Sequence, residues 1–362
     1  MSAGLPGRRR PASGIVGTDR MFTVELKPSG HRFKVTEDDV ILDMALKQGF
    51  RMPYGCRAGT CKSCRAKVMS GEVDVGRAFP APSFMLRARQ AGGFTLMCRA
   101  TAKSDLVIEV DEQPDLPDVL RYSAQVAEVD YVGTDVAILR LRLTEGLLSF
   151  VAGQFVDLLL PDGVRRSYSI ADSPAATGRE TVEFHIRHMP GGLFTDRLFG
   201  RSLVGETIEI EAPLGSFYLR EAVKPVIMLA SGTGYAPIRS ILLDTLPRSL
   251  DREFVLYWGA RRPADIYRME EAAELASTYP NFSFVPVLSE AREEDRWTGR
   301  QGLVHRAVME DYASLAGFQV YACGVPAMVN AAFADFSAHR ELPETEFFAD
   351  AFVTQSDLAG SV

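Results

Sequence analysis

Four of the five cysteines in this chain follow a spacing that narrows its fold and chemistry more than any other feature does. Cys56, Cys61 and Cys64 form a C-x4-C-x2-C pattern, and Cys98 follows at a distance. A [2Fe–2S] cluster is bound at this spacing by three thiolates from one tight loop and one distant thiolate. The alternative is a structural zinc site, but zinc motifs generally bring paired C-x2-C units, and this pattern has one. Because such a cluster carries single electrons, the spacing predicts an electron-transfer protein.

The residues between these cysteines suit a loop that folds around a cluster. Ala58 and Gly59 are small and allow the backbone to come close to the inorganic core. Arg57, Lys62 and Arg65 add positive charge beside an anionic centre. Backbone N–H groups of the same loop can point at the sulfides and tune the reduction potential.

Charge is distributed unevenly along the chain. The formal net charge is −7, yet residues 21–110 carry fourteen Lys and Arg against nine Asp and Glu, a net of +5. Residues 1–20 add four arginines and one aspartate, which leaves −15 on residues 111–362. Two interpretations remain open: the basic and acidic parts attract each other, or a basic rim around the cluster docks an acidic partner. Nucleic acid is a poor candidate, because the basic residues form no dense run with interleaved aromatics.

The length of 362 residues and the changes in residue pattern along the chain predict three domains. No apolar run reaches the roughly eighteen residues of a membrane span, and the N-terminus has no apolar signal-peptide core. We therefore expect a cytoplasmic protein without disulfides, a monomer that binds neither membrane nor nucleic acid. The predicted segments are a disordered leader (1–20), a cluster domain (21–112), an antiparallel β-barrel (118–222), an α/β domain with a parallel sheet (223–353) and a tail (354–362).

Within the cluster domain, we expect a small sheet that clasps one helix, a β-grasp arrangement. Strands are predicted at 22–26, 32–35 and 106–110, and a hairpin around Ser70-Gly71. The helix should begin at Glu37–Asp39 and end at Gly49. Residues 113–117, with two prolines in an acidic stretch, are the first linker candidate.

Three further segments suggest nucleotide binding. Gly232-Thr233-Gly234 follows the buried strand 226–230 and precedes a helical run, and Pro237 stands where the dinucleotide fingerprint has its third glycine. Gly191 and Gly192 form a glycine turn, and Thr195 can begin a helix whose amino end faces a phosphate. Arg166-Ser167-Tyr168-Ser169 taken alone indicates a surface arginine beside a core tyrosine, although a planar fork would also suit phosphate and an aromatic face a flat ring.

In this order, the segments resemble the ferredoxin reductase superfamily of flavin and nicotinamide oxidoreductases. The resemblance implies that Tyr168 stacks on the isoalloxazine, that Arg166 pairs with flavin phosphate and that Ser169 lies near flavin N5. It also implies that Gly191, Gly192 and Thr195 face the flavin pyrophosphate, and that Gly232, Thr233, Gly234 and Pro237 cradle the pyridine nucleotide.

The carboxyl-terminal part carries two more segments of this resemblance. Cys323-Gly324-Val325-Pro326 is similar to the family's C-G-x-P segment beside the nicotinamide, where Cys323 would shape the hydride-transfer pocket without acting as a nucleophile. Phe352 is similar to the terminal aromatic residue that approaches the flavin ring. After the strand at 254–258, Arg261 and Asp265 fall in a G-x-R-x-x-x-D-x-Y segment, which is common in NADH-dependent members, although the arginine would also suit NADPH.

The domain order is similar to that of reductase components of bacterial multicomponent oxygenases: a plant-type ferredoxin domain precedes a ferredoxin-NAD(P) reductase-like module. The resemblance implies a β-grasp ferredoxin, a flavin-binding barrel and a Rossmann-like nucleotide domain. Electrons would pass from NADH to FAD, to the [2Fe–2S] cluster, and to an acceptor protein docking near the cluster. A soluble di-iron monooxygenase of the phenol, alkane or alkene type is the expected acceptor. The alternatives are a reductase for a CDP-deoxysugar dehydrase and a non-catalytic redox sensor.

Overall fold

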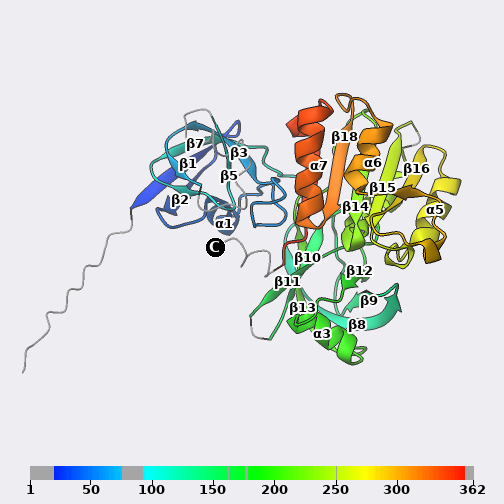
Figure 1. Cartoon of the computed structure of the whole chain (residues 1–362). Helices are drawn as coiled ribbons and strands as arrows, with labels where there is room; N and C mark the ends of the chain where they lie inside the picture. The colour runs from blue at the N-terminus through cyan, green and yellow to red at the C-terminus, as the bar shows by residue number, and fades with distance from the viewer. Residues whose placement is uncertain (1–19, 76–92, 162, 176–177, 250, 355–362) are drawn as a thin grey trace, which may run out of the picture.

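Three large β-sheets define three domains in the computed structural model, which describes residues 20–75, 93–161, 163–175, 178–249 and 251–354. We call them the N-terminal domain (strands β1–β7), the barrel (β8–β13) and the C-terminal domain (β14–β19). The predicted leader and nearly all of the predicted tail lie outside the described residues. Figure 1 shows the N-terminal domain beside the other two, which are stacked on each other.

The N-terminal domain is a five-stranded sheet, in the order β2-β1-β7-β3-β5, with one helix packed against it. The two central strands β1 and β7 run parallel, and their neighbours run antiparallel to them. The elements are β1 (Met21–Lys27), β2 (Arg32–Thr36), α1 (Ile41–Lys47), β3 (Arg65–Ser70), β5 (Phe94–Leu96) and β7 (Leu106–Glu109), with a separate pair β4 (Val73–Asp74) and β6 (Thr101–Ala102). This is the β-grasp arrangement.

Two local predictions in this domain are wrong. No hairpin forms at Ser70-Gly71, because β3 pairs with β5 and β7 while β4 pairs with β6. Gly71, at φ 91°, packs so tightly against the Asp105 carbonyl that the chain turns out of the sheet there. The helix begins at Ile41, later than predicted, because the Asp39 carboxylate accepts hydrogen bonds from the N–H and hydroxyl of Thr36 and forms a turn instead.

The barrel is a six-stranded antiparallel sheet in the order β11-β10-β13-β8-β9-β12. A bridge between Ile170 and Phe184 connects its two outer strands and closes it. Its core consists of the inward side chains of all six strands together with Phe194 and Leu198 of the single helix. The elements are β8 (Leu120–Val132), β9 (Val136–Leu143), β10 (Phe155–Leu159), β11 (Arg165–Ser169), β12 (Thr181–Arg187), α3 (Leu193–Gly200) and β13 (Thr207–Leu214).

The C-terminal domain has a six-stranded parallel sheet in the order β17-β16-β15-β14-β18-β19. The chain order reverses between β14 and β18, which makes the crevice beyond their carboxyl ends the place where such folds bind ligands. The elements are β14 (Val226–Ser231), η1 (Gly232–Gly234), α4 (Tyr235–Thr245), β15 (Phe254–Ala260), η2 (Pro263–Asp265), α5 (Met269–Thr278), β16 (Phe282–Leu288), η3 (Glu293–Asp295), β17 (Arg300–Gln301), α6 (Val304–Asp311), β18 (Gln319–Gly324), α7 (Pro326–His339), η4 (Glu344–Glu346) and β19 (Phe347–Ala351).

The N-terminal domain contacts both of the others. The Tyr54 N–H donates to Ser216 Oγ of the barrel at 2.8 Å, and that hydroxyl donates back to the Tyr54 carbonyl at 2.9 Å. Gln113, in the predicted linker, is buried and accepts a hydrogen bond from the Tyr218 hydroxyl. In Figure 1, α7 is the helix of the C-terminal domain that faces the N-terminal domain. Among the described residues, no helix has the length and apolar character needed to cross a membrane.

Candidate redox site

The four predicted cluster ligands come together as two pairs of thiols. Cys61 N–H and Ala58 N–H donate to Cys56 Sγ at 3.3 and 3.4 Å, and Cys56 N–H donates to Cys61 Sγ at 3.4 Å. Cys64 and Cys98 hydrogen bond through their side chains. In the described part of the chain, no three His, Cys, Asp or Glu side chains are placed to bind one metal ion. Each pair of thiols suits one iron of a [2Fe–2S] cluster, in which each of the two irons binds two thiolates.

The loop between these cysteines adopts an unusual backbone. Arg57 and Lys62 have φ of 52° and 63°, in the left-handed region that side chains other than glycine rarely enter, and Gly59 has φ 85°. Such conformations cluster at sites where the surrounding structure imposes them. Here they bring the N–H groups of Cys56, Ala58 and Cys61 toward the Sγ atoms of Cys56 and Cys61.

Two of the three basic residues near the cluster loop face the C-terminal domain. Arg65 Nη1 lies 2.5 Å from Glu344 Oε2, and Lys62 Nζ lies 4.0 Å from the centroid of the Phe333 ring. Only Arg57 stays exposed, with its guanidinium 4.7 Å from the centroid of the Tyr54 ring. Contacts with the C-terminal domain therefore engage Lys62, through an aromatic ring, and Arg65, through an acidic side chain, and they leave Arg57 exposed.

Strand β19 separates the cluster loop from the predicted hydride-transfer pocket. Ser63 Oγ donates to the Ala349 carbonyl at 2.9 Å, and a Cβ built on Gly55 would lie 3.1 Å from Asp350 Oδ1 and 3.3 Å from Cys61 Sγ. Asp350 is paired with Cys323 across β18 and β19. Burial and the neighbouring Cys61 thiol raise the pKa of Asp350 to about 7. The cluster loop and Cys323 thus lie on either side of one strand.

The predicted flavin residues lie on β11 in an arrangement that distinguishes two adjacent arginines. Arg165 is held by Glu211 at 2.5 Å and by Asp157 at 3.3 Å. Arg166 donates to the Arg165 carbonyl at 2.9 Å and makes no ion pair within the described residues, so its guanidinium remains available for a phosphate. Tyr168 lies 5.7 Å from Phe194, ring centroid to ring centroid, and burial raises its pKa, which keeps the hydroxyl protonated.

The glycine turn lies beside this strand at the start of α3. Thr195 Oγ1 accepts from Met189 N–H at 3.2 Å and donates to the Met189 carbonyl at 2.9 Å, which fixes the turn, and Gly191 has φ 81°. A Cβ on Gly192 would meet Thr195 Oγ1 at 2.5 Å. A hollow of about 240 Å³ adjoins it, lined by Leu160, Pro161, Leu193, Phe194 and Arg197. A free guanidinium, an aromatic ring, a glycine turn and this hollow fit the phosphates, the flat ring and the adenosine of FAD.

The predicted coenzyme loop lies at the switch point between β14 and β18. Gly232 has φ 53°, and a Cβ on Gly234 would lie 2.1 Å from the Cys323 carbonyl oxygen. Gly324, at φ 135°, approaches Ser231 so closely that an added Cβ would lie 2.1 Å from Ser231 Oγ. Pro237 is in the first turn of α4, where a missing N–H costs nothing. The two loops pack backbone to backbone and leave room only for glycine.

The residues predicted near the nicotinamide gather at the same edge. Cys323 is buried, and burial raises its pKa, so it remains a neutral thiol and fits a pocket-shaping role. Phe352 N–H donates to the Gly324 carbonyl at 2.8 Å, and Pro326 is the first residue of α7. The structure thus brings together Cys323, Gly324, Phe352 and the Gly232 loop, which are far apart in the sequence.

Asp265 has a different environment from the one a ribose-binding carboxylate requires. Its oxygens accept from the Arg262 N–H at 3.2 Å and from Thr134 Oγ1 of the barrel at 3.0 Å. Arg261 Nε lies 3.8 Å away, and the Arg261 side chain is 61% exposed. Asp265 therefore stabilises the η2 turn and its contact with the barrel, and Arg261 remains largely exposed beside it.

Sequence reasoning missed the residues that join the domains around the site. No role follows from the sequence for the Ser63 side chain of the cluster loop, for Asp350 or for Ser216, and only the fold brings β19 and the barrel to this loop. Polar and apolar residues alternate in Thr181–Arg187, and this pattern could have predicted a polar strand face. It places Glu183, His185 and Arg187 on one side of β12, and Val182, Phe184 and Ile186 on the other.

Comparison with known families and proteins agrees with this geometry. Residues 24–103 match the 2Fe-2S iron-sulfur cluster binding domain, residues 123–218 the oxidoreductase FAD-binding domain and residues 228–333 the oxidoreductase NAD-binding domain. CDP-6-deoxy-L-threo-D-glycero-4-hexulose-3-dehydrase reductase of Yersinia pseudotuberculosis is 39% identical over 92% of this chain and 98% of its own. The reductase component of phenol 2-monooxygenase from Pseudomonas sp. strain CF600 is 36% identical over 94% and 96%.

A solved structure has the same full-length architecture. The Amycolatopsis cytochrome P450 reductase GcoB aligns with a TM-score of 0.72 at 34% identity, over 92% of this chain and 99% of its own. These relatives are reductases, several of them components of multicomponent systems, which implies a separate redox acceptor and argues against a non-catalytic sensor. The chain therefore belongs to the family of reductases that join a [2Fe–2S] ferredoxin domain to an FAD- and NAD-binding module, and it is an NAD(P)H-dependent flavin and iron–sulfur oxidoreductase.

Proposed function

We propose that this chain is the NADH-dependent reductase component of a multicomponent oxygenase, with a soluble di-iron monooxygenase as its acceptor. When bound, FAD accepts a hydride and passes its electrons on singly, and the cluster carries one electron at a time. Arg166 would bind the flavin phosphate, Tyr168 would cover the ring, and Gly232–Gly234 would hold the coenzyme. The observation that carries the proposal is the position of β19, which has the cluster loop on one side and Cys323 on the other.

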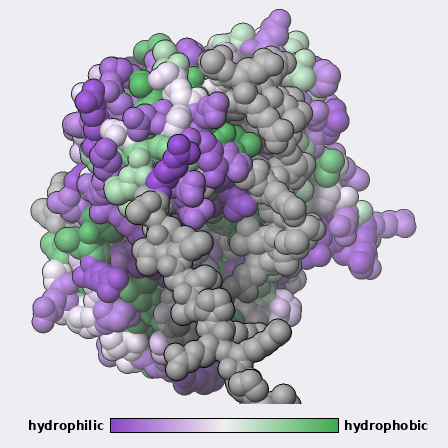
Figure 2. All heavy atoms as spheres, turned by 90° about the vertical axis from the view of Figure 1, so that its left-hand side faces the viewer, coloured by the Kyte–Doolittle hydropathy of each residue, from purple (hydrophilic) through white to green (hydrophobic). Residues whose placement is uncertain are grey.

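The acceptor would dock where the cluster loop is still accessible. Lys62 and Arg65 are engaged with the C-terminal domain, so Arg57 is the basic residue of the loop region that an acidic partner can meet. Figure 2 views the molecule from the side of the N-terminal domain, where hydrophilic residues dominate the described surface and hydrophobic patches are small. Such a surface suits a transient, electrostatically guided encounter.

A second acceptor is supported by the comparisons themselves. The Yersinia dehydrase reductase is slightly more similar to this chain than the phenol and propane monooxygenase components are. The experiment supplies the reductase and NADH to two purified acceptors, a phenol hydroxylase and the CDP-hexulose dehydrase, and measures product formed per NADH consumed. Coupled product with the hydroxylase alone supports the proposal, whereas coupled product with the dehydrase alone replaces it with the second candidate.

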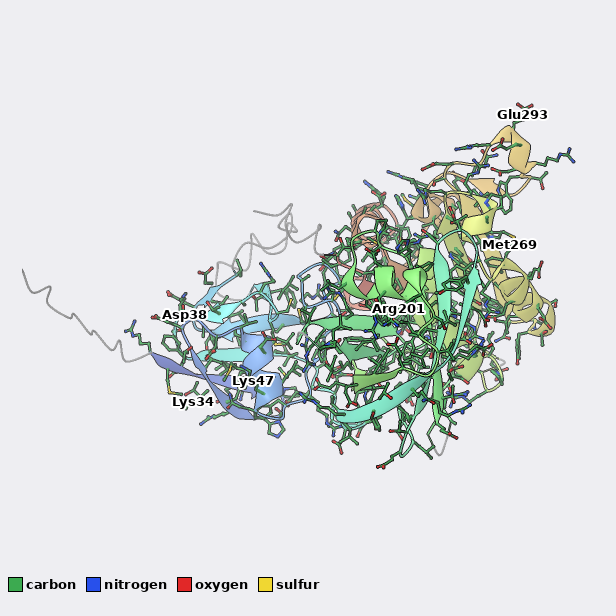
Figure 3. The ribbon with its side chains drawn as sticks, turned by 90° about the horizontal axis from the view of Figure 1, so that it is seen from below. Lys34, Asp38, Lys47, Arg201, Met269 and Glu293 are labelled. Carbon is green, nitrogen blue, oxygen red and sulfur yellow. The ribbon has the colours of Figure 1, made fainter. Side chains whose placement is uncertain are left out.

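NADH is the proposed coenzyme because acidic residues surround one of the two arginines after β15. Arg262 is neutralised by Glu294 at 2.8 Å and Asp295 at 2.7 Å, which lie in the loop after β16. Glu293 of the same loop stands at the end of the C-terminal domain remote from the N-terminal domain, on which Lys34, Asp38 and Lys47 lie (Figure 3). A 2′-phosphate would meet this acidic loop. The ratio of kcat/KM for NADH to that for NADPH tests the assignment, and a ratio below one contradicts it.

Arg166 offers a direct test of the flavin site. Arg166→Gln is expected to weaken FAD binding by roughly 10- to 100-fold, because a charge-assisted contact to phosphate is lost. The measurement is a titration of FAD into apoprotein followed by flavin fluorescence. Arg165→Gln is the matched control: Arg165 is already paired with Glu211 and Asp157, so its loss should leave FAD affinity unchanged. Equal weakening by both substitutions would contradict the assignment of Arg166.

A further inference from the structure

Strand β12 of the barrel presents a polar face to the C-terminal domain. Val182, Phe184 and Ile186 are in the barrel core, so the alternating residues Glu183, His185 and Arg187 point out of it. Glu183 and His185 are each only 5% exposed, although one is charged and the other titratable. Buried polar side chains of this kind require partners, and here the partners come from both the barrel and the C-terminal domain.

The His185 ring links Glu183 to Tyr267 of the C-terminal domain. His185 Nε2 lies 3.0 Å from Glu183 Oε1, and Nδ1 lies 2.7 Å from the Tyr267 hydroxyl. Arg140 binds the other Glu183 oxygen at 2.8 Å, so the carboxylate is ionised and can only accept. His185 Nε2–H therefore donates to Glu183, and Nδ1 accepts from the Tyr267 hydroxyl. Burial lowers the pKa of His185, in agreement with a neutral ring.

Tyr267 continues this chain of contacts to the coenzyme loop. Its ring meets Trp258 edge-on, with centroids 5.2 Å apart and planes at 87°. Trp258 stacks on Tyr235, the first residue of α4, at 4.0 Å. The Trp258 indole Nε1–H donates to the Gly232 carbonyl at 3.2 Å. Glu183, His185, Tyr267 and Trp258 thus form a continuous chain of contacts, buried except for the partly buried Tyr267, that ends on the backbone of the loop.

The opposite side of Gly232 is covered by the same barrel strand. Arg187 is anchored by Asp135 at 3.1 Å, and its Nη1 lies 2.9 Å from where a Cβ of Gly232 would be. Gly232 has φ 53° and little intrinsic conformational preference, so the direction of its peptide groups depends on its neighbours. The loop that has to aim its N–H groups at the coenzyme phosphates is held between the barrel and Trp258.

We propose that His185 is a positioning residue for the pyridine nucleotide: through Tyr267 and Trp258 it fixes the Gly232 carbonyl, so that the barrel sets the geometry of the coenzyme loop. His185 touches neither coenzyme nor flavin in this assignment. Its effect is on coenzyme affinity, because the loop forms its contacts with the phosphates only when the carbonyl is held. The inference rests on the NAD(P)H reaction of the family and is independent of the acceptor protein.

Two single substitutions and the double variant test this chain of contacts from His185 to Gly232. His185→Phe keeps a ring but removes both hydrogen bonds, and Trp258→Phe keeps an aromatic ring against Tyr235 but removes the indole donor. Each is expected to raise the KM for NADH and the Kd for NAD⁺ by roughly three- to tenfold while kcat changes less than about twofold, since each substitution releases the single hydrogen bond that holds the Gly232 carbonyl, directly in Trp258→Phe and through Tyr267 in His185→Phe. In the double variant the increase should not exceed that of the more severe single substitution, because both act on the same carbonyl.

Tyr257→Phe is the matched control, since Tyr257 is on the same strand as Trp258 but donates its hydroxyl to Asp311, outside the chain of contacts. It should leave both constants unchanged. FAD content and melting temperature are recorded for every variant, and if His185→Phe fails to fold, Trp258→Phe still decides the question. Unchanged KM and Kd in Trp258→Phe, or effects that multiply in the double variant, would overturn the proposal.

Discussion

Replacing Cys98 by alanine is expected to abolish electron delivery through the cluster to cytochrome c, while NADH still reduces the flavin and, through it, ferricyanide. Cys98 pairs with Cys64, so its loss leaves one half of the cluster site with a single protein thiolate. The barrel and the C-terminal domain have hydrophobic clusters of their own, to which Cys98 does not belong, so the flavin and coenzyme sites should persist. The measurements are iron and sulfide content, the EPR signal of the reduced protein, and NADH-driven reduction of ferricyanide compared with cytochrome c.

Cys323→Ala is the control for this experiment because it removes the remaining cysteine, which is buried in β18 and has no role as a cluster ligand in this assignment. It should retain full iron and sulfide, whatever it does to coenzyme turnover. If Cys98→Ala also retained the cluster and its EPR signal, the assignment of the fourth ligand would be wrong.

The cysteine spacing could predict the cluster because all but one of the ligands lie within nine residues, from Cys56 to Cys64. The positions of these three thiolates therefore depend mainly on the local backbone. The same holds for Gly232-Thr233-Gly234, where strand, turn and helix follow each other directly. The failed hairpin at Ser70-Gly71 shows the limit of such reasoning. A glycine turn is visible in the sequence. However, the strand that pairs with β3 is β7, which begins more than thirty residues later and could not be identified from the local sequence.

Contacts between domains could not be predicted from the sequence either. The basic residues of the cluster loop were equally compatible with an internal or an external partner, and only the fold shows Arg65 on Glu344 and Lys62 on Phe333. Asp265 illustrates the same point, since its position in the motif says nothing about Thr134 of the barrel, which occupies one of its oxygens. Electrostatic pairing depends on which surfaces meet, and that is decided by packing of domains far apart in the chain.

Gly234→Ala is expected to prevent reduction by NADH without removing either redox group. The added methyl would lie 2.1 Å from the Cys323 carbonyl oxygen and 2.8 Å from the Gly324 nitrogen, both backbone atoms of the neighbouring strand. Because backbone cannot rotate away as a side chain does, the coenzyme loop must move off β18, at a cost of roughly 1–3 kcal/mol. The movement separates the two loops that are predicted to line the hydride-transfer pocket.

For this variant, the rate of flavin bleaching by NADH in a stopped-flow spectrophotometer should fall by roughly 100-fold or more, because misplaced reacting groups lose that much rate. Reduction by dithionite, which needs no coenzyme loop, should give the wild-type flavin and cluster spectra. Gly317→Ala in the same domain is the control, since a Cβ there meets nothing within 4 Å. A Gly234→Ala protein that NADH bleaches at the wild-type rate would show that the packing of this loop against Cys323 is not required for hydride transfer.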